Sequence, residues 1–190
     1  MAAQTLRAYS ALSHPVVIVD YDSRWPTLFE EERRRILGAI GHKVLALEHI
    51  GSTAVPGLGA KPIIDMMAGI RGSEDADECV RLLQPLGYDD VTPEPDNPEW
   101  FYCLGTRAPG QKEGEYVHLH LVKYLSDHWV RHLLFRDYLR THPEVALQYF
   151  ELKKRLAAQY GSDRPGYTEA KTKFIESVVA QASREGASAK

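Results

Sequence analysis

The stretch EHIGSTAVPGLGAKPIIDMMAGI, residues 48–70, organises the rest of this sequence. Two short apolar runs, VLALEHI at residues 44–50 and PIIDMMAGI at residues 62–70, flank a loop rich in glycine and proline. Apolar runs of this length are typical of strands when turn-forming residues bound them, and the loop residues favour tight turns. We therefore expect two strands joined by a compact loop.

Two reactive groups stand at the ends of this loop: the Ser52 hydroxyl after the first strand and the Asp65 carboxylate inside the second. Asp65 interrupts an apolar run, and burial of an unpaired carboxylate costs free energy. Asp65 therefore has either a structural partner or a place in a ligand-binding cleft. The loop is not a phosphate-binding P-loop, because Lys61 precedes a proline rather than Ser or Thr and the glycine spacing differs.

The composition is that of a single soluble domain, with 44% hydrophobic and 26% charged residues in a chain of 190. The formal net charge of −3 argues against nucleic acid or an anionic membrane as partner. Two cysteines are too few for a disulfide scaffold, and the sequence shows no signal peptide or membrane-spanning apolar run. We expect a cytoplasmic protein.

The hydrophobic pattern before and after the central loop predicts further elements. A first strand is expected at residues 15–21, followed by a helix from Arg24 to a stop at Gly38. Ser73 is expected to cap a second helix that ends at Gly87. Three more strands are predicted, at residues 88–91, 100–104 and 115–122.

The strand at residues 115–122 carries a second group of candidate functional residues. Its apolar side chains alternate with Tyr116, His118 and His120, so the two histidines share one face of the strand. The opposite, apolar face should meet the helices. A pair of histidines at this spacing is a weak metal signal unless a third ligand joins it, and Asp65 on the same sheet face would be that ligand.

The C-terminal third is expected to be helical. Ser126 is predicted to cap one helix, and Thr141 and Glu144 to form a capping box for the next. A final helix is expected at residues 168–182. Residues 1–15 and 183–190 are interpreted as flexible tails around one domain at residues 16–182.

Two basic residues of these helices lie at or beside the apolar stripe, Arg136 next to Trp129 and Leu133, and Lys171 next to Phe174. Basic side chains at such positions often extend from the edge of the core into solvent. Two such cations could also face one shared anion, so both remain candidate ligand-binding residues.

Several stretches together resemble the GrpB family, also known as UPF0157. They are IVDYDSRWPTLFEEE, EHIGSTAVPGLGAKPIIDMM, HLHLV, LLFRDYLRTHPEVALQYFELKKRLA and YTEAKTKFI, in this order along residues 16–182. The resemblance implies an α/β (α+β) fold of the nucleotidyltransferase-like kind. In such a fold, helices pack on one face of a mixed β-sheet and further helices are added at the C-terminus.

The resemblance also implies roles for individual residues. In that superfamily a Gly-Ser pair after a strand holds nucleotide phosphates, which here indicates Gly51, Ser52 and the adjacent Thr53. A carboxylate on the next strand, here Asp65, then carries a divalent metal. Charge on the phosphates would be neutralised by the basic candidates Lys61, Arg136 and Lys171.

The sequence departs from that pattern at Met67, where the superfamily has a second carboxylate. A thioether is not a ligand for magnesium. Either His118 or His120 completes an atypical site with Asp65, for magnesium, manganese or zinc, or the cleft binds an anion without metal. Asp65, His118 and His120 are thus predicted both as metal ligands and as catalytic residues.

Our leading functional hypothesis is transfer of a nucleotidyl group from a nucleotide to a small-molecule acceptor. A second hypothesis is a catalytically degenerate member of the fold that binds a nucleotide or phosphorylated metabolite as a regulator. A third is a scaffold that binds another protein. The sequence predicts neither the acceptor nor the oligomeric state.

Overall fold

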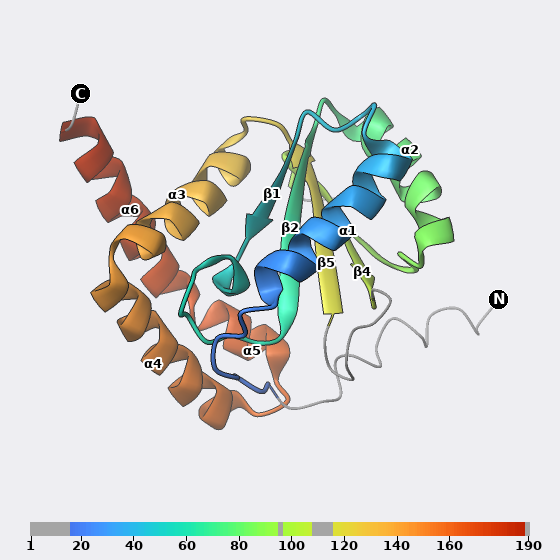
Figure 1. The fold of residues 1–190 in the computed structure, drawn as a ribbon. Helices are drawn as coiled ribbons and strands as arrows, with labels where there is room; N and C mark the ends of the chain where they lie inside the picture. The colour runs from blue at the N-terminus through green and yellow to red at the C-terminus, as the bar shows by residue number, and fades with distance from the viewer. Residues whose placement is uncertain (1–15, 95–96, 108–115, 189–190) are drawn as a thin grey trace.

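The computed structural model describes residues 16–94, 97–107 and 116–188 of the chain (Figure 1). A five-stranded mixed sheet stands beside a group of C-terminal helices. The elements in chain order are α1 (Trp25–Ile40), β1 (Ala46–Ile50), the 3₁₀ turn η2 (Ser52–Ala54), β2 (Ile63–Ile70), α2 (Ser73–Leu83), the 3₁₀ turn η3 (Gln84–Leu86), β3 (Asp90–Pro93), β4 (Trp100–Thr106), β5 (Tyr116–Lys123), α3 (Asp127–Thr141), α4 (Pro143–Tyr160), α5 (Arg164–Glu169) and α6 (Thr172–Ser188).

The strands lie in the order β1-β2-β5-β4-β3. β2 and β5 form the one parallel pair among the described strands, and the other three pairs are antiparallel. In the parallel register Asp65 lies opposite His118, and Met67 lies opposite His120. Because side chains alternate between the two faces of a sheet, the predicted residues Asp65, His118 and His120 share one face.

The other face of the sheet packs on α1 and α2. Side chains that alternate with the polar ones, such as Ile64 and Met66 of β2 and Leu119 of β5, are fully buried against Ile36 and Cys79 of the two helices. The predicted helix-covered apolar face is therefore confirmed for residues 116–122, and residue 115 lies outside the described part. This side of the molecule holds the main core.

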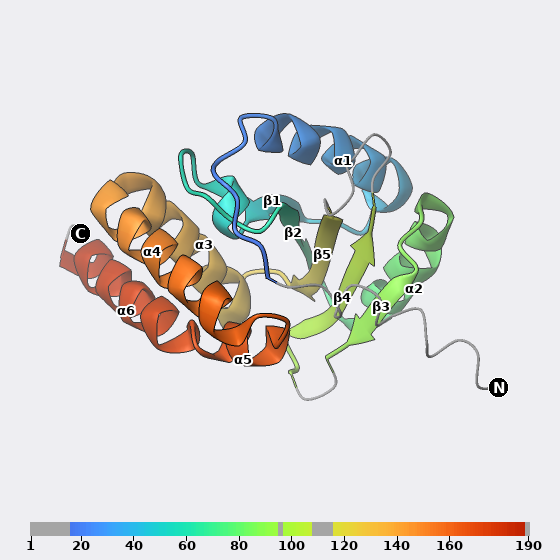
Figure 2. The same cartoon turned by 90° about the horizontal axis from the view of Figure 1, so that it is seen from below.

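The C-terminal helices form a second layer next to the β1–β2 side of the sheet (Figure 2). Trp129 of α3 packs on Ile50, Met67 and Val122 from the polar face of the sheet. The loop after β1 contributes Val55 to an apolar cluster whose remaining members come largely from α3, α4 and α6. The expectation of a mixed sheet with added C-terminal helices is thus confirmed, and these helices partly cover the face that bears Asp65.

Two predicted N-terminal features differ in the structure. In place of a strand at residues 15–21, of which residue 15 lies outside the described part, Val19 forms an isolated bridge with Ala60. Helix α1 continues through Gly38 to Ile40 instead of stopping at Gly38. A glycine inside a helix costs only about 1 kcal/mol, and burial of Ile36 and Ile40 offsets that cost.

Two C-terminal predictions also need correction. Thr141 does not form a capping box, because it ends α3 and its hydroxyl donates within that helix, while the N-cap of α4 is His142. The predicted final helix is two helices, with a break at Ala170 and Lys171. Helix α6 then extends to Ser188, through most of the expected C-terminal tail.

The remaining predicted elements are present with shifted ends. Ser126 caps α3 by accepting a hydrogen bond from the Trp129 amide, as predicted. The second helix caps at Gly72 instead of Ser73, and Gly87 ends its 3₁₀ extension with a positive φ of 90°. The predicted tail at residues 1–15 lies outside the described residues. Within the described ranges, no helix combines the length and apolarity needed to cross a membrane.

Candidate functional site

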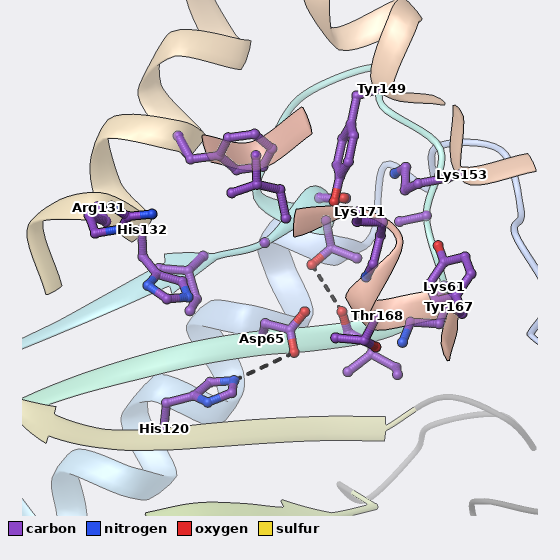
Figure 3. Close-up of a pocket in the computed structure, with 18 of the residues that line it drawn as sticks. Lys61, Asp65, His120, Arg131, His132, Tyr149, Lys153, Tyr167, Thr168 and Lys171 are labelled. Atoms are coloured by element: carbon purple, nitrogen blue, oxygen red, sulfur yellow. Dashed lines mark hydrogen bonds and ion pairs between the residues drawn. The ribbon is translucent and has the colours of Figure 1, made fainter. Parts of the chain in front are cut away.

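A cavity of about 400 Å³ lies between the polar face of the sheet and the C-terminal helices (Figure 3). Its volume falls in the range of small-molecule sites. Among the described residues, four lysine or arginine side chains, two histidines and one carboxylate line it: Lys61, Arg131, Lys153, Lys171, His120, His132 and Asp65. The aromatic rings of Phe135, Tyr149 and Tyr167 form much of the remaining wall. The cavity is therefore positively charged and aromatic.

The Gly-Ser loop forms one wall of the cavity, as the sequence predicted. Gly51 follows β1 with a positive φ of 69°, which favours glycine. A Cβ on Gly51 would lie 2.7 Å from Asp65 Oδ2, so glycine is also required for the loop to approach β2. Ser52 starts the turn η2 and lines the cavity together with Tyr149 of α4.

Thr53, predicted to bind phosphate, has a structural role. Its side chain is buried, and its hydroxyl donates to the Ile63 carbonyl at 3.1 Å. His49 Nε2 lies 3.0 Å from the same hydroxyl, and burial lowers the pKa of His49 to about 4, so this imidazole is neutral. Thr53 therefore joins the start of the loop to the start of β2.

Asp65 and the two predicted histidines form an ion-paired cluster on the sheet. His118 Nδ1 lies 3.4 Å and His120 Nε2 lies 3.9 Å from Asp65 Oδ1. Burial would raise the pKa of Asp65, but hydrogen bonds and charge from both histidines hold it far below its usual value. Burial lowers the pKa of His120, yet the neighbouring Cys103 sulfur and Asp65 carboxylate raise it to about 10. Asp65 is thus an anion whose charge is already compensated.

The same residues do not fit a divalent metal. Met67, at the position of the second carboxylate, is fully buried. The two imidazoles approach one oxygen of Asp65 instead of converging with it on a common point. In the part of the chain that the structure describes, no three His, Cys, Asp or Glu side chains are grouped to hold a metal ion. We therefore describe the cluster as Asp65 ion paired with His120 and close to His118, and we assign no step to a metal.

Three lysines line the opposite side of the cavity from three different elements. Lys61 precedes β2, Lys153 lies on α4, and Lys171 lies at the break between α5 and α6. The ammonium groups of Lys61 and Lys171 lie 5.5 Å and 4.4 Å from the centre of the Tyr167 ring. Lys153 is 3% exposed and donates to the Gly59 carbonyl at 2.5 Å. Its ammonium lies 4.8 Å from the centre of the Tyr149 ring.

Burial and mutual repulsion destabilise the charged forms of these lysines. Burial, together with the charges of Lys171 and Lys61, lowers the pKa of Lys153 to about 7. Burial, with the charge of Lys61, lowers the pKa of Lys171 to about 8, although Asp65 acts in the opposite direction. Within the described residues, none of these three lysines forms an ion pair with a carboxylate. Their charge is uncompensated.

Arg136, predicted to bind a ligand, lies outside the cavity lining. Its guanidinium donates to Glu48 Oε2 at 2.7 Å, to the His49 carbonyl at 3.0 Å and to the Asp137 carboxylate. Arg140, one turn along α3, donates to the Ala54 carbonyl at 2.9 Å. The two arginines therefore bind the chain on both sides of Ser52, Arg136 at the end of β1 and Arg140 at the end of η2, and neither lines the cavity.

The structure brings together most of the predicted site residues. Among the predicted residues, Gly51, Ser52, Thr53, Lys61, Asp65, His120 and Lys171 line the cavity, whereas His118 and Arg136 do not. Sequence reasoning missed Lys153, Arg131, His132, Tyr149 and Tyr167. A signal existed for Lys153, because it lies four residues after Tyr149 and three before Leu156 on the buried stripe of α4.

The family assignment agrees with this arrangement. A family model described as "GrpB protein" matches residues 15–181. The chain belongs to the GrpB protein family. The matched range includes every residue of the cavity described above.

Individual relatives extend the GrpB assignment. The UPF0157 protein YqkA of Bacillus subtilis is 36% identical over 171 residues, which are 89% of this chain and 48% of YqkA. The chain thus spans about half the length of that relative. The crystal structure of the conserved protein GrpB from Enterococcus faecalis has a TM-score of 0.75 and 31% identity, over 89% of this chain and 98% of that one. A dephospho-CoA kinase of Mycolicibacterium paratuberculosis is 26% identical over 88% of this chain and 46% of its own length.

Proposed function

We propose that this GrpB protein binds a nucleotide or another phosphorylated small molecule in the cavity between the sheet and the C-terminal helices. One observation carries the proposal: Lys61, Lys153 and Lys171 meet at one cavity without a carboxylate partner in the described chain. Buried cations are normally paired, because an unpaired charge is costly to desolvate. An anionic ligand supplies the missing partner.

The rest of the lining supports a phosphorylated organic molecule over a free inorganic anion. Tyr149, Tyr167 and Phe135 offer ring surfaces for the body of a ligand, and the Ser52 hydroxyl can donate to a phosphate oxygen. Arg131, exposed at α3, adds one more cation to the lining. The dephospho-CoA kinase among the relatives acts, by its name, on a nucleotide-containing compound, which is consistent with this ligand class.

A second candidate function is transfer of a nucleotidyl group from that ligand to a small-molecule acceptor. The observation that favours it is the Asp65–His120 pair, which lines the same cavity as the lysines. With a pKa of about 10, His120 is a cation at neutral pH and can stabilise negative charge or donate a proton to a leaving group. Lysine ammonium groups would neutralise charge on the phosphates.

The binding proposal is tested by thermal shift of the purified chain against nucleotides, coenzyme A and sugar phosphates, each beside its unphosphorylated counterpart. Saturable binding raises stability by about 2.7 kcal/mol at a hundredfold excess over Kd. We expect a shift with a phosphorylated compound and none with its counterpart. The shift should shrink in Lys171→Met and persist in Lys173→Met, whose lysine is exposed at the start of α6.

No shift with any phosphorylated compound would contradict the proposal and favour a scaffold that binds another protein. For the transferase candidate, the compound that binds is incubated with possible acceptors, with and without magnesium, manganese or zinc. We expect product release that is lost in Asp65→Asn. Binding without product under all of these conditions would leave a regulatory ligand-binding protein.

A further inference from the structure

We infer that the lysine side of the cavity is a subsite for a phosphate group with at least two negative charges, such as a terminal phosphomonoester or a pyrophosphate, and that it discriminates against phosphodiesters. This inference rests on the proposed function and narrows its ligand class. We name Lys61, Lys153 and Lys171 the lysine subsite. It adds Lys153 to two lysines already expected to neutralise phosphate charge, and it does not include the Gly-Ser loop, to which the family resemblance also assigns phosphate binding.

The geometry of the lysine subsite supports a compact, highly charged group. The ammonium groups of Lys61 and Lys171 lie 5.5 Å and 4.4 Å from the centre of the Tyr167 ring, both residues line the cavity, and the charge of Lys61 lowers the pKa of Lys171. Lys153 is buried on helix α4, and the charges of Lys171 and Lys61 lower its pKa. Three cations around one region are matched by a group whose charge is concentrated on a few oxygen atoms.

Charge counting separates the ligand classes. A phosphodiester carries one negative charge, a phosphomonoester carries nearly two above its second pKa of about 6, and a pyrophosphate carries more. Asp65, the one carboxylate among the described lining residues, is already paired with His120. A single negative charge would therefore leave the lysine subsite with an excess of buried positive charge, whereas two or three would balance it.

Binding at this subsite should also take up protons. The groups facing Lys153 are Lys61, Lys171 and the ring of Tyr149, and those facing Lys171 are Lys61, Asp65 and the ring of Tyr167. Arg164 adds its charge near Lys61, which also faces Asp65. In this mostly cationic surrounding the amines lose protons at neutral pH, and a multiply charged anion reverses the balance.

The size of the uptake follows from the two pKa values. With values of about 7 for Lys153 and about 8 for Lys171, saturation at pH 7.5 should take up roughly one proton per ligand. Because both amines are protonated in the complex, the affinity for a dianion such as methyl phosphate, whose second pKa of about 6 lies below this range, should fall about sixtyfold between pH 7 and pH 8.5. A phosphodiester should show little of either effect.

Isothermal titration calorimetry with pyrophosphate, methyl phosphate and dimethyl phosphate tests the inference. Titrations in two buffers of different ionisation enthalpy measure the protons taken up, and repetition at pH 7 and pH 8.5 measures the affinity change. We expect the affinity order pyrophosphate, methyl phosphate, dimethyl phosphate. Lys171→Met should weaken pyrophosphate at least tenfold, Lys153→Met should do the same, and Lys173→Met should leave it unchanged.

Each other outcome overturns the inference in an identifiable way. Equal binding of methyl and dimethyl phosphate without proton uptake would exclude charge discrimination, while the broader proposal of phosphate binding would stand. Failure of all three probes, together with a thermal shift by an intact nucleotide, would place the phosphate elsewhere in the cavity. No binding of the three probes and no thermal shift with any phosphorylated compound would contradict both the inference and the proposed function.

Discussion

The two sides of the cavity carry their charge in opposite ways. On the sheet, Asp65 lies 3.4 Å and 3.9 Å from two imidazoles, so its charge has a partner as soon as the chain folds. On the helical side, Lys153 and Lys171 contact a carbonyl and a tyrosine ring, and no carboxylate of the described chain pairs with them. Folding alone compensates the charge of Asp65, but only a bound anion can compensate the charges of the lysines.

This difference separates residues that stabilise the folded site from residues that bind the ligand. A compensated charge stabilises the protein, so its removal should lower stability with or without ligand. An uncompensated charge destabilises the empty protein and contributes only when an anion is bound. The two sides should therefore respond to substitution with opposite signs.

The largest expected loss of stability comes from a substitution at Gly51, the backbone neighbour of Asp65. In Gly51→Ala the new Cβ would lie 2.7 Å from Asp65 Oδ2, in a backbone conformation with φ of 69° that disfavours alanine. Displacement of Asp65 and backbone strain together should cost about 3 kcal/mol and lower Tm by roughly 10 °C, measured by circular dichroism.

Gly38→Ala is the matched control for that substitution. A Cβ at Gly38 meets no atom within 4 Å, and alanine in a helix gains up to about 1 kcal/mol over glycine. Gly38→Ala should therefore raise Tm slightly. If both variants change Tm equally, the close approach between Gly51 and Asp65 does not matter for stability.

The second prediction removes the negative charge directly. Asp65→Asn leaves His120 without its anionic partner and should cost about 2 kcal/mol at pH 6, a fall in Tm of roughly 5 °C. Glu151→Gln serves as control, because Glu151 pairs with Lys154 at the exposed surface of α4 and should change stability by less than about 0.5 kcal/mol.

The pH dependence of the Asp65→Asn effect follows from both pKa shifts. The pKa of Asp65 is lowered on folding, so its contribution is present above about pH 4 and is lost as the pH falls further. The pKa of His120 is raised to about 10, so its contribution is complete below about pH 6.5 and is lost as the pH rises through 10. The Tm difference between the two proteins should shrink from pH 6 to pH 10, and a constant difference would contradict the ion pair.

The strand pattern predicted the compensated side well. Alternation of polar and apolar residues placed His118 and His120 on one sheet face, because strand periodicity is local and strict. Whether Asp65 shares that face stayed open in the sequence, because Asp65 lies in a continuous apolar run. The parallel pairing of β2 with β5, which sets Asp65 opposite His118, depends on contacts across 53 positions of sequence separation and was not predicted. The metal role stays a prediction that this geometry does not favour, since both imidazoles approach the carboxylate oxygen that a metal would need.

The uncompensated side was predicted only in part. Lys171 and Arg136 have the same local pattern, a basic residue beside an apolar stripe, yet Lys171 lines the cavity and Arg136 binds Glu48, 88 residues earlier in the chain. Lys153 has that pattern as well and was missed. Helical periodicity shows that such a residue lies near the core, but only the tertiary structure shows which acceptor it meets.

The third prediction, and the smallest, concerns the lysine side without ligand. Lys171→Met keeps the apolar stem and removes a charge that has no anionic partner within the described chain. We expect the ligand-free variant to be about 1 kcal/mol more stable at pH 7, with Tm raised by roughly 3 °C. Lys173→Met, which removes an exposed charge two residues away, should change Tm little.

The sign of its pH dependence is opposite to that of Asp65→Asn. Because the pKa of Lys171 is lowered to about 8 on folding, its penalty is complete below about pH 8 and is relieved as the pH rises toward the unfolded value of about 10.4. The advantage of Lys171→Met should therefore disappear near pH 10. Saturating pyrophosphate at pH 7 should reverse the order of Tm, since the anion stabilises the protein that retains Lys171 more strongly than the variant. A ligand-free variant that is less stable than the wild type would mean that Lys171 is held by the fold and not kept for a ligand.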